Sequence, residues 1–278
     1  MNKFLTSNLI ILLFCFVSVA QTPEKVKGNK NVTIVQTELK PFHSLEIDED
    51  FNVEIIYNTT PSVTIETDEN LHEFINFAVV NGVLSFDTAT RITSKKRLNI
   101  TVNYNDSLNH IKVTDSGEIL SLTTMNLASA VLIAEGSAKV GLTIKTSNFE
   151  LQGIGKAKLK LNLTCDKAKI SLTDTNRLEA LINAPITQID LYQRASAIVE
   201  GSAETFRIRT DNYSDFNGRN FATKTCTTLN EVASEVYLDV TDSLTVDASG
   251  SSSIYLYGEP EIVVTKLSGT SKIQKKEK

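Results

Sequence analysis

Within residues 41–104, apolar side chains occupy every second position of four short runs, as they do in half-buried β-strands. A fifth apolar segment, Phe77–Phe86, is interrupted by the dipeptide Asn81-Gly82, which favours a type I′ turn and therefore a β-hairpin. The only helical turn that the pattern allows lies at Asp68–Phe74. This part of the chain is predicted to be β-rich, with alternating runs at Ser44–Ile47, Asn52–Tyr57, Ser62–Thr67 and Leu98–Tyr104.

From residue 105 onwards the alternation becomes periodic. Each unit holds an alternating strand, then a turn rich in Ser, Gly, Ala, Asn or Asp, then an apolar residue that opens the next strand. Nine such anchor residues recur every 18 to 21 positions, which gives a unit of about 19 residues. A unit of this size cannot bury its own apolar face and needs stacked neighbours. The anchors are Ile119, Val140, Leu159, Leu178, Ile198, Phe216, Val236, Ile254 and Ile273.

A parallel β-helix is the architecture that fits this period. Leucine-rich repeats of similar length need a Leu/Asn signature that this sequence lacks, and propeller blades need about 40 residues. We therefore predict an all-β fold in which coils over residues 105–274 stack about 4.8 Å apart, after a β-rich part over residues 41–104. Cys165 and Cys226 then lie three coils, or about 14 Å, apart, beyond the ~7 Å reach of a disulfide. Both are predicted to be free thiols.

The N-terminus has the order of a secretory signal peptide. Lys3 is followed by an unbroken apolar run, Leu9–Val17, and by the small residues Ser18-Val19-Ala20. The run is shorter than the roughly 20 residues of a membrane-spanning helix, and no later segment approaches that length. We predict a signal peptide at 1–20, a flexible polar lead-in at 21–40, a charged tail at 275–278, no transmembrane segment in the mature chain, and export to the periplasm, the cell surface or the medium.

Composition narrows the function. The 28 basic and 33 acidic residues leave a net charge of −5, which argues against a nucleic-acid partner because such binding needs a clustered basic face. The three histidines are scattered, at His43, His72 and His110, so no zinc site and no cofactor are expected. No G-x-S-x-G elbow supports nucleophilic hydrolysis. We therefore expect a protein without catalytic residues, which is not an enzyme.

The stretch Asp211–Arg219 comes closest to a ligand site. Asp211 and Asp215 could bind Ca²⁺ or a sugar, with the Tyr213 ring stacked on the sugar. The alternative is an irregular corner in which Asp and Asn side chains bond their own backbone. The spacing does not match a calcium loop, because Tyr213 stands where the first carboxylate ligand should be. Tyr192 is a candidate through a set of tyrosines that form either a sugar-binding stripe or ordinary strand residues: Tyr192, Tyr213, Tyr237, Tyr255 and Tyr257.

Lysines alternate along the run Lys156–Lys160 and recur at Lys167 and Lys169. Alternation places them on one strand face. That face is either a solvated outer surface or a contact surface for acidic glycans.

The order of these features resembles a known family, the putative auto-transporter adhesin, head GIN domain family, over about residues 42–273. The resemblance implies a right-handed parallel β-helix in an exported bacterial protein of the cell surface or periplasm. The turns at 173–177, 193–197 and 231–235 depart from the family pattern because they lack glycine. The features that carry the resemblance are Phe42-His43-Ser44-Leu45-Glu46-Ile47, Phe51-Asn52-Val53-Glu54-Ile55, the hairpin Val79-Val80-Asn81-Gly82-Val83-Leu84, and the repeated Ser-Gly-x-x-x-Ile turns.

Three hypotheses for the function remain. The first is an exported, non-enzymatic, adhesin-like protein that binds a glycan or another envelope component through a long side face. The second is a polysaccharide lyase or hydrolase centred on Asp211 and Asp215. The third is a structural or envelope-stress protein without a ligand of its own. The sequence carries no signal for an oligomeric state.

Overall fold

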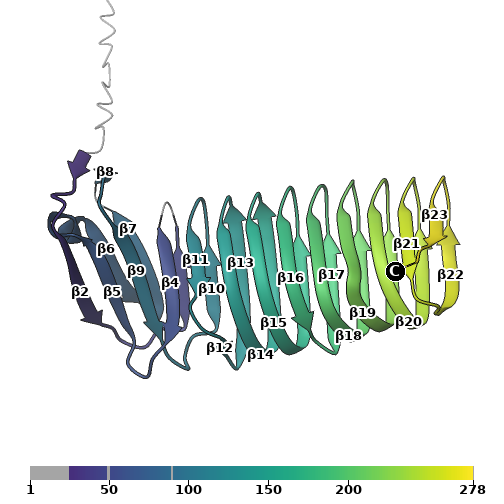
Figure 1. Ribbon diagram of the computed structural model, residues 1–278, viewed down its shortest axis with the longest axis horizontal. Coiled ribbons are helices and arrows are strands. Elements are labelled where there is room, and N and C mark those ends of the chain that lie inside the picture. The colour runs from purple at the N-terminus through teal and green to yellow at the C-terminus, as the bar shows by residue number, and fades with distance from the viewer. Residues whose placement is uncertain (1–24, 49–50, 89, 278) are drawn as a thin grey trace, which may run out of the picture.

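The computed structural model describes residues 25–48, 51–88 and 90–277, which form an elongated, nearly all-β solenoid (Figure 1). Its coils are about 19 residues long, as the sequence period predicts. The predicted signal peptide, residues 1–20, lies outside the described residues. None of the described helices is long and apolar enough to span a membrane.

Each coil contributes one strand to each of two parallel sheets, here called face 1 and face 2. Five long strands bend at one corner and so belong to both faces. Along the axis, face 1 contains β9 (Leu98–Tyr104), β4 (Asn52–Tyr57), β11 (Glu118–Ser121), β12 (Met125–Asn126), the first parts of β14 (Lys139–Gly155) and β15 (Lys158–Leu172), β16 (Arg177–Asn183), the first parts of β18 (Ser196–Thr210), β19 (Asp215–Asn230) and β20 (Glu235–Ala248), β21 (Ser253–Tyr257) and β23 (Lys272–Lys275).

Face 2 runs alongside in the same direction. It contains β7 (Val83–Thr88), β3 (Ser44–Ile47), β10 (His110–Val113), β13 (Ser129–Gly136), the second parts of β14 and β15, β17 (Ile186–Leu191), the second parts of β18, β19 and β20, and β22 (Glu261–Leu267).

The N-terminal part continues the solenoid and closes its first end. The predicted hairpin is present, with Asn81 and Gly82 at φ 51° and 78° between its two strands. β3 and β4 pair directly with β10 and β11 of the next coil, although about 60 residues of chain intervene. The remaining elements at this end are β1 (Lys25–Lys27), β2 (Val32–Glu38), β5 (Ser62–Asp68), the 3₁₀ helix η1 (Glu69–Phe74), β6 (Ile75–Val80) and β8 (Arg91–Ser94).

The flexible lead-in expected at residues 21–40 is wrong for its second half. Val32–Glu38 is a strand, β2, which pairs antiparallel with all seven residues of β5. The local sequence is polar and gives a weak strand signal. The backbone hydrogen bonds offered by the edge of β5 decide the conformation instead.

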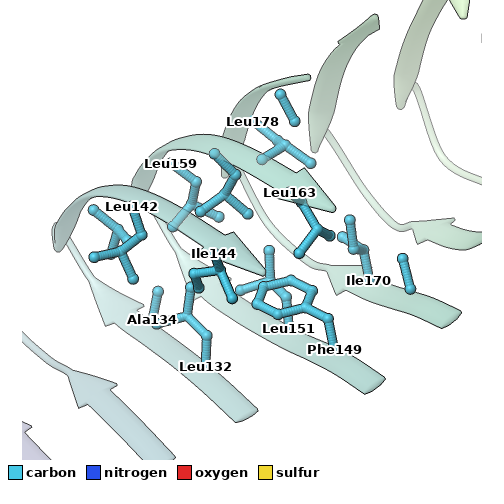
Figure 2. Packing of buried hydrophobic residues seen from close by; sticks show 14 of the residues in the cluster. Leu132, Ala134, Leu142, Ile144, Phe149, Leu151, Leu159, Leu163, Ile170 and Leu178 are labelled. Carbon is cyan, nitrogen blue, oxygen red and sulfur yellow. The ribbon is translucent and has the colours of Figure 1, made fainter. Parts of the chain in front are cut away.

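The core lies between the two faces and consists of apolar columns, one residue per coil (Figure 2). In the strand Lys158–Leu172, for example, Leu159, Leu161 and Leu163 are buried while the intervening side chains are exposed. Burying each such side chain contributes about 1.5–3 kcal/mol. The core therefore extends through the whole rod and is not divided between two domains.

The register confirms eight of the nine predicted anchors as one stacked column. The exception is Ile198, which is 49% exposed, whereas its neighbour Ala197 is fully buried and pairs with Leu178 and Phe216. Strict alternation admits only one of two adjacent residues to the core. The small Ala197 takes that place because the coil begins one residue earlier than the larger side chain implied.

Stacked turns join face 2 to face 1, and most contain one residue with left-handed backbone. Glycine supplies it in several coils, as at Gly250 (φ 77°). The predicted turns without glycine keep the same geometry with Asp174, Gln193 and Val232, at φ 67°, 64° and 63°. Hydrogen bonds between consecutive turns hold these residues in a conformation that they rarely adopt alone.

The predicted free thiols are confirmed, since Cys165 and Cys226 are both buried and unpaired. Burial raises the pKa of the Cys165 thiol to about 11 and also raises that of Cys226. Both side chains behave as small core residues rather than reactive groups.

Candidate functional site

A hollow of about 610 Å³ lies along the stacked turns between face 2 and face 1. Hydrogen bonds from the Lys156 and Arg194 amides to the preceding turns show that these residues occupy equivalent places in successive coils, 19 residues apart for each coil. We call this feature the corner hollow. Its polar lining comes from Lys156, Asp174, Gln193, Arg194, Asn212 and Tyr213.

Tyr213, one of the predicted ligand-binding residues, lines the corner hollow with 66% of its surface exposed. Asn212 and Tyr213 both have left-handed backbone, at φ 52° and 68°. A bulky residue in this region is strained, and such strain is concentrated at functional sites. The turn therefore displays an aromatic ring to solvent at a cost in backbone energy.

The turn beneath Tyr213 is held by Ser214, which is 1% exposed. The Ser214 hydroxyl accepts a hydrogen bond from the Asp211 amide at 2.9 Å and donates one to the Leu191 carbonyl oxygen at 3.2 Å. The Asp211 backbone thus has the structural role that the alternative interpretation of this segment expected. Its carboxylate lies on the face 2 side of the turn, before the corner.

Asp215 lies on the other side of the corner, at the start of β19 on face 1. Its partners in register are Ser196 and Glu235, not Asp211. Partial burial and the negative charge of Glu235 raise the pKa of the Asp215 carboxyl. Among the residues that the structure describes, no group of three or more His, Cys, Asp or Glu side chains is placed to hold a metal ion.

Tyr192 lies one coil before Asp211, and its ring is covered by a guanidinium group. The Arg209 Cζ atom is 5.3 Å from the ring centroid, and Arg209 also forms an ion pair with Glu231 at 3.1 Å. Tyr192 is therefore engaged within the protein. The four predicted ligand-binding residues surround one corner, but of these only Tyr213 lines the corner hollow.

The predicted stripe of five tyrosines does not form one surface. Tyr237 and Tyr255 stack on each other on face 1, with ring centroids 4.6 Å apart, and Lys276 covers Tyr255 at 4.9 Å. Tyr257 is 6% exposed. Within the described part of the chain, the Tyr213 ring has no ring or cation contact, so its faces are available to a ligand.

The predicted single face of lysines is also wrong. Lys158 and Lys160 lie on face 1, whereas Lys167 and Lys169 lie on face 2, because β15 bends at the corner between them. Lys160 is paired with Glu179 at 3.4 Å and Lys169 with Glu150 at 2.9 Å.

Two arginines that sequence reasoning missed, Arg177 and Arg194, lie beside the remaining lysines. Lys158 and Arg177 are register partners, and Arg194 lines the corner hollow together with Lys156. The 19-residue period was the signal that could have found them. Adding one period to Lys158 leads to Arg177, and adding two periods to Lys156 leads to Arg194.

A second hollow of about 540 Å³ lies on the outer surface of face 1. Gly141 leaves space in its floor, and the exposed side chains of Leu181 and Ile198 line it together with the Lys160–Glu179 ion pair. We call it the face hollow. Lys158 and Arg177 are two residues before Lys160 and Glu179 on their strands, so they lie between the corner hollow and the face hollow.

Comparison with solved structures finds the same fold in other proteins. A putative adhesin from Parabacteroides merdae is 17% identical (TM-score 0.60, covering 90% of this chain and 98% of that one). A putative adhesin and a putative lipid binding protein from Parabacteroides distasonis are 18% and 14% identical (TM-scores 0.60 and 0.64), each aligned over 91% of this chain and over 100% and 99% of their own. Identities this low establish a shared fold. No curated protein matches the sequence.

A family model matches most of the chain, in agreement with the resemblance noted from the sequence. The match covers residues 41–260, which include β3 to β21, the corner hollow and the face hollow. The chain belongs to the putative auto-transporter adhesin, head GIN domain family.

Proposed function

We propose that this protein is an exported, non-enzymatic, adhesin-like protein that binds a glycan of the cell envelope or of a neighbouring cell along the corner between its two faces. Export is supported by the N-terminal sequence and by the family, and the location is the periplasm, the cell surface or the medium.

The observation that carries the proposal is the exposed ring of Tyr213 in the corner hollow. Sugar rings present apolar C–H faces that pack on aromatic side chains, and their hydroxyl groups bond to amides, carboxylates and cations. The corner hollow offers all of these within one surface, through Tyr213, Gln193, Asp174 and Arg194. Because the solenoid repeats along its axis, an extended polymer can contact several coils at once.

The catalytic alternative has less support. A lyase or hydrolase centred on Asp211 and Asp215 needs both carboxylates to face one substrate bond. These residues lie on opposite sides of the turn, and the corner hollow includes neither of them.

The test is a glycan array probed with the wild-type protein and with Tyr213→Ala. We expect the wild type to retain at least one polysaccharide and the variant to bind it about tenfold more weakly, since a stacked ring contributes about 1–1.5 kcal/mol. Tyr57→Ala is the matched control, because Tyr57 is 42% exposed on β4 near the other end of the solenoid. The proposal fails if no glycan is retained, or if Tyr213→Ala and Tyr57→Ala bind as the wild type does.

A further inference from the structure

Four cationic side chains gather where the corner hollow meets face 1. Lys156 and Arg194 line the corner hollow, and Lys158 and Arg177 lie in register on the adjoining strands β15 and β16. All four are exposed. This set is here called the cation cluster. It stands on a protein whose net charge is −5, so it is a local reversal of the overall sign.

The cation cluster lacks internal neutralisation. Within the described ranges, none of its four members forms an ion pair, whereas the adjacent Lys139 and Lys160 are paired with Glu118 and Glu179 at 3.2 and 3.4 Å. The carboxylate of the corner hollow, Asp174, accepts a hydrogen bond from the Gly155 amide at 3.0 Å. One carboxylate therefore faces four cations.

This arrangement opposes stability. Like charges directly opposite each other on adjacent strands repel, and Lys158 faces both Arg177 and Lys139 in register. Elsewhere on these sheets the same position carries compensating pairs, such as Lys169 with Glu150. Unpaired cations kept in register are accounted for by an external anion that bridges them.

The charge along this column changes sign beyond the cluster. In register after Arg177 come Ser196, Asp215 and Glu235, so the surface turns acidic about two coils further along. The raised pKa of Asp215 reflects this concentration of negative charge. An anionic chain is thus attracted over the coils from Lys139 to Arg194 and repelled beyond them, which gives the site a defined end.

We propose that the ligand is an acidic glycan whose carboxylates bind the cation cluster while its sugar rings contact Tyr213 and the face hollow. Adjacent coils are about 4.8 Å apart, so the cations are spaced for successive charged units of a linear polymer that runs along the axis. Lys158 and Arg177 supply the carboxylate contacts at its centre, where Arg can bind a carboxylate with two parallel hydrogen bonds. The inference rests on the proposed function and specifies its ligand class.

The experiment measures affinity for polygalacturonate, a linear polyuronate, and for neutral dextran of matched length. We expect the wild type to bind polygalacturonate more tightly than dextran, with an affinity that falls as salt rises from 20 to 300 mM in the assay, because salt screens exposed charges. The double substitution Lys158→Gln with Arg177→Gln should weaken polygalacturonate binding by about tenfold or more and leave dextran binding unchanged.

The matched control is Lys224→Gln with Lys275→Gln, which removes the same charge from two exposed lysines that are paired with Glu204 and Glu259. It should bind polygalacturonate as the wild type does. Equal losses in both double variants would mean that attraction is non-specific, and equal binding of dextran and polygalacturonate would remove the acidic preference. Either result overturns the inference but leaves the Tyr213 proposal standing, whereas binding to neither polymer, with an empty glycan array, overturns both.

Discussion

Phe206 offers a sensitive test of the core and its register. Its side chain is 1% exposed on the face 2 part of β18. Its ring centroid lies 5.3 Å from that of Phe216, at a tilt of 37°, and 5.2 Å from that of Phe221, nearly edge to face. Both partners are buried, so three rings from two coils form one contact group inside the rod.

Phe206→Ala removes the member that touches both other rings. Deleting a buried Phe side chain costs about 3–5 kcal/mol, and two lost aromatic contacts place this site near 4 kcal/mol. With a urea slope of about 3 kcal/mol per molar, the unfolding midpoint should fall by about 1.3 M. Because each coil contacts only its neighbours, amide exchange should accelerate most in β18 and β19 and least near β4.

Ile198→Ala is the matched control on the same strand. Ile198 is 49% exposed and lies one residue beyond the buried Ala197, so its truncation should cost less than about 1 kcal/mol. The two variants together test the strand register. If Ile198→Ala were as destabilising as Phe206→Ala, or if Phe206→Ala cost less than about 1.5 kcal/mol, the assignment of inward and outward positions on β18 would be wrong.

Two further predictions concern the turns and the acidic end of face 1. Gly250→Ala should destabilise by at least about 2 kcal/mol in urea unfolding, since Gly250 has φ 77° and its new methyl group would overlap the Val232 carbonyl oxygen, whereas Gly141→Ala meets only the end of the Leu120 side chain and should cost under about 1 kcal/mol; equal costs would contradict the turn geometry. Asp215→Asn should stabilise the protein at pH 7 by about 0.2–1 kcal/mol, because burial and Glu235 raise the Asp215 pKa in the folded state. A raised acid pKa adds stability below the unfolded pKa and loses it as pH rises through the folded pKa, so the gain from Asn should shrink towards pH 3; a gain of equal size at pH 3 and pH 7 would exclude this cause.

The sequence by itself determined the architecture. Alternation placed the strands, and the period of about 19 residues led to a solenoid whose register the structure confirms at eight anchors, from Ile119 to Ile273. Both signals reflect a local rule, since every coil must offer apolar side chains inward at equivalent positions. The buried, unpaired state of Cys165 and Cys226 followed from the same spacing.

The tertiary structure decided which residues share a surface. Tyr192, Tyr213 and Asp215 lie within 24 residues of one another, yet the corner sends them to different sides, while Lys156 and Arg194 meet from two coils apart. Strand β2 forms because the edge of β5 is available, and Ile198 is excluded from the core because Ala197 precedes it. The physical reason is that side-chain direction reverses at every residue and at each corner. A shift of one position in register therefore moves a side chain from the core to the surface, and a bend in a strand moves it from one face to the other.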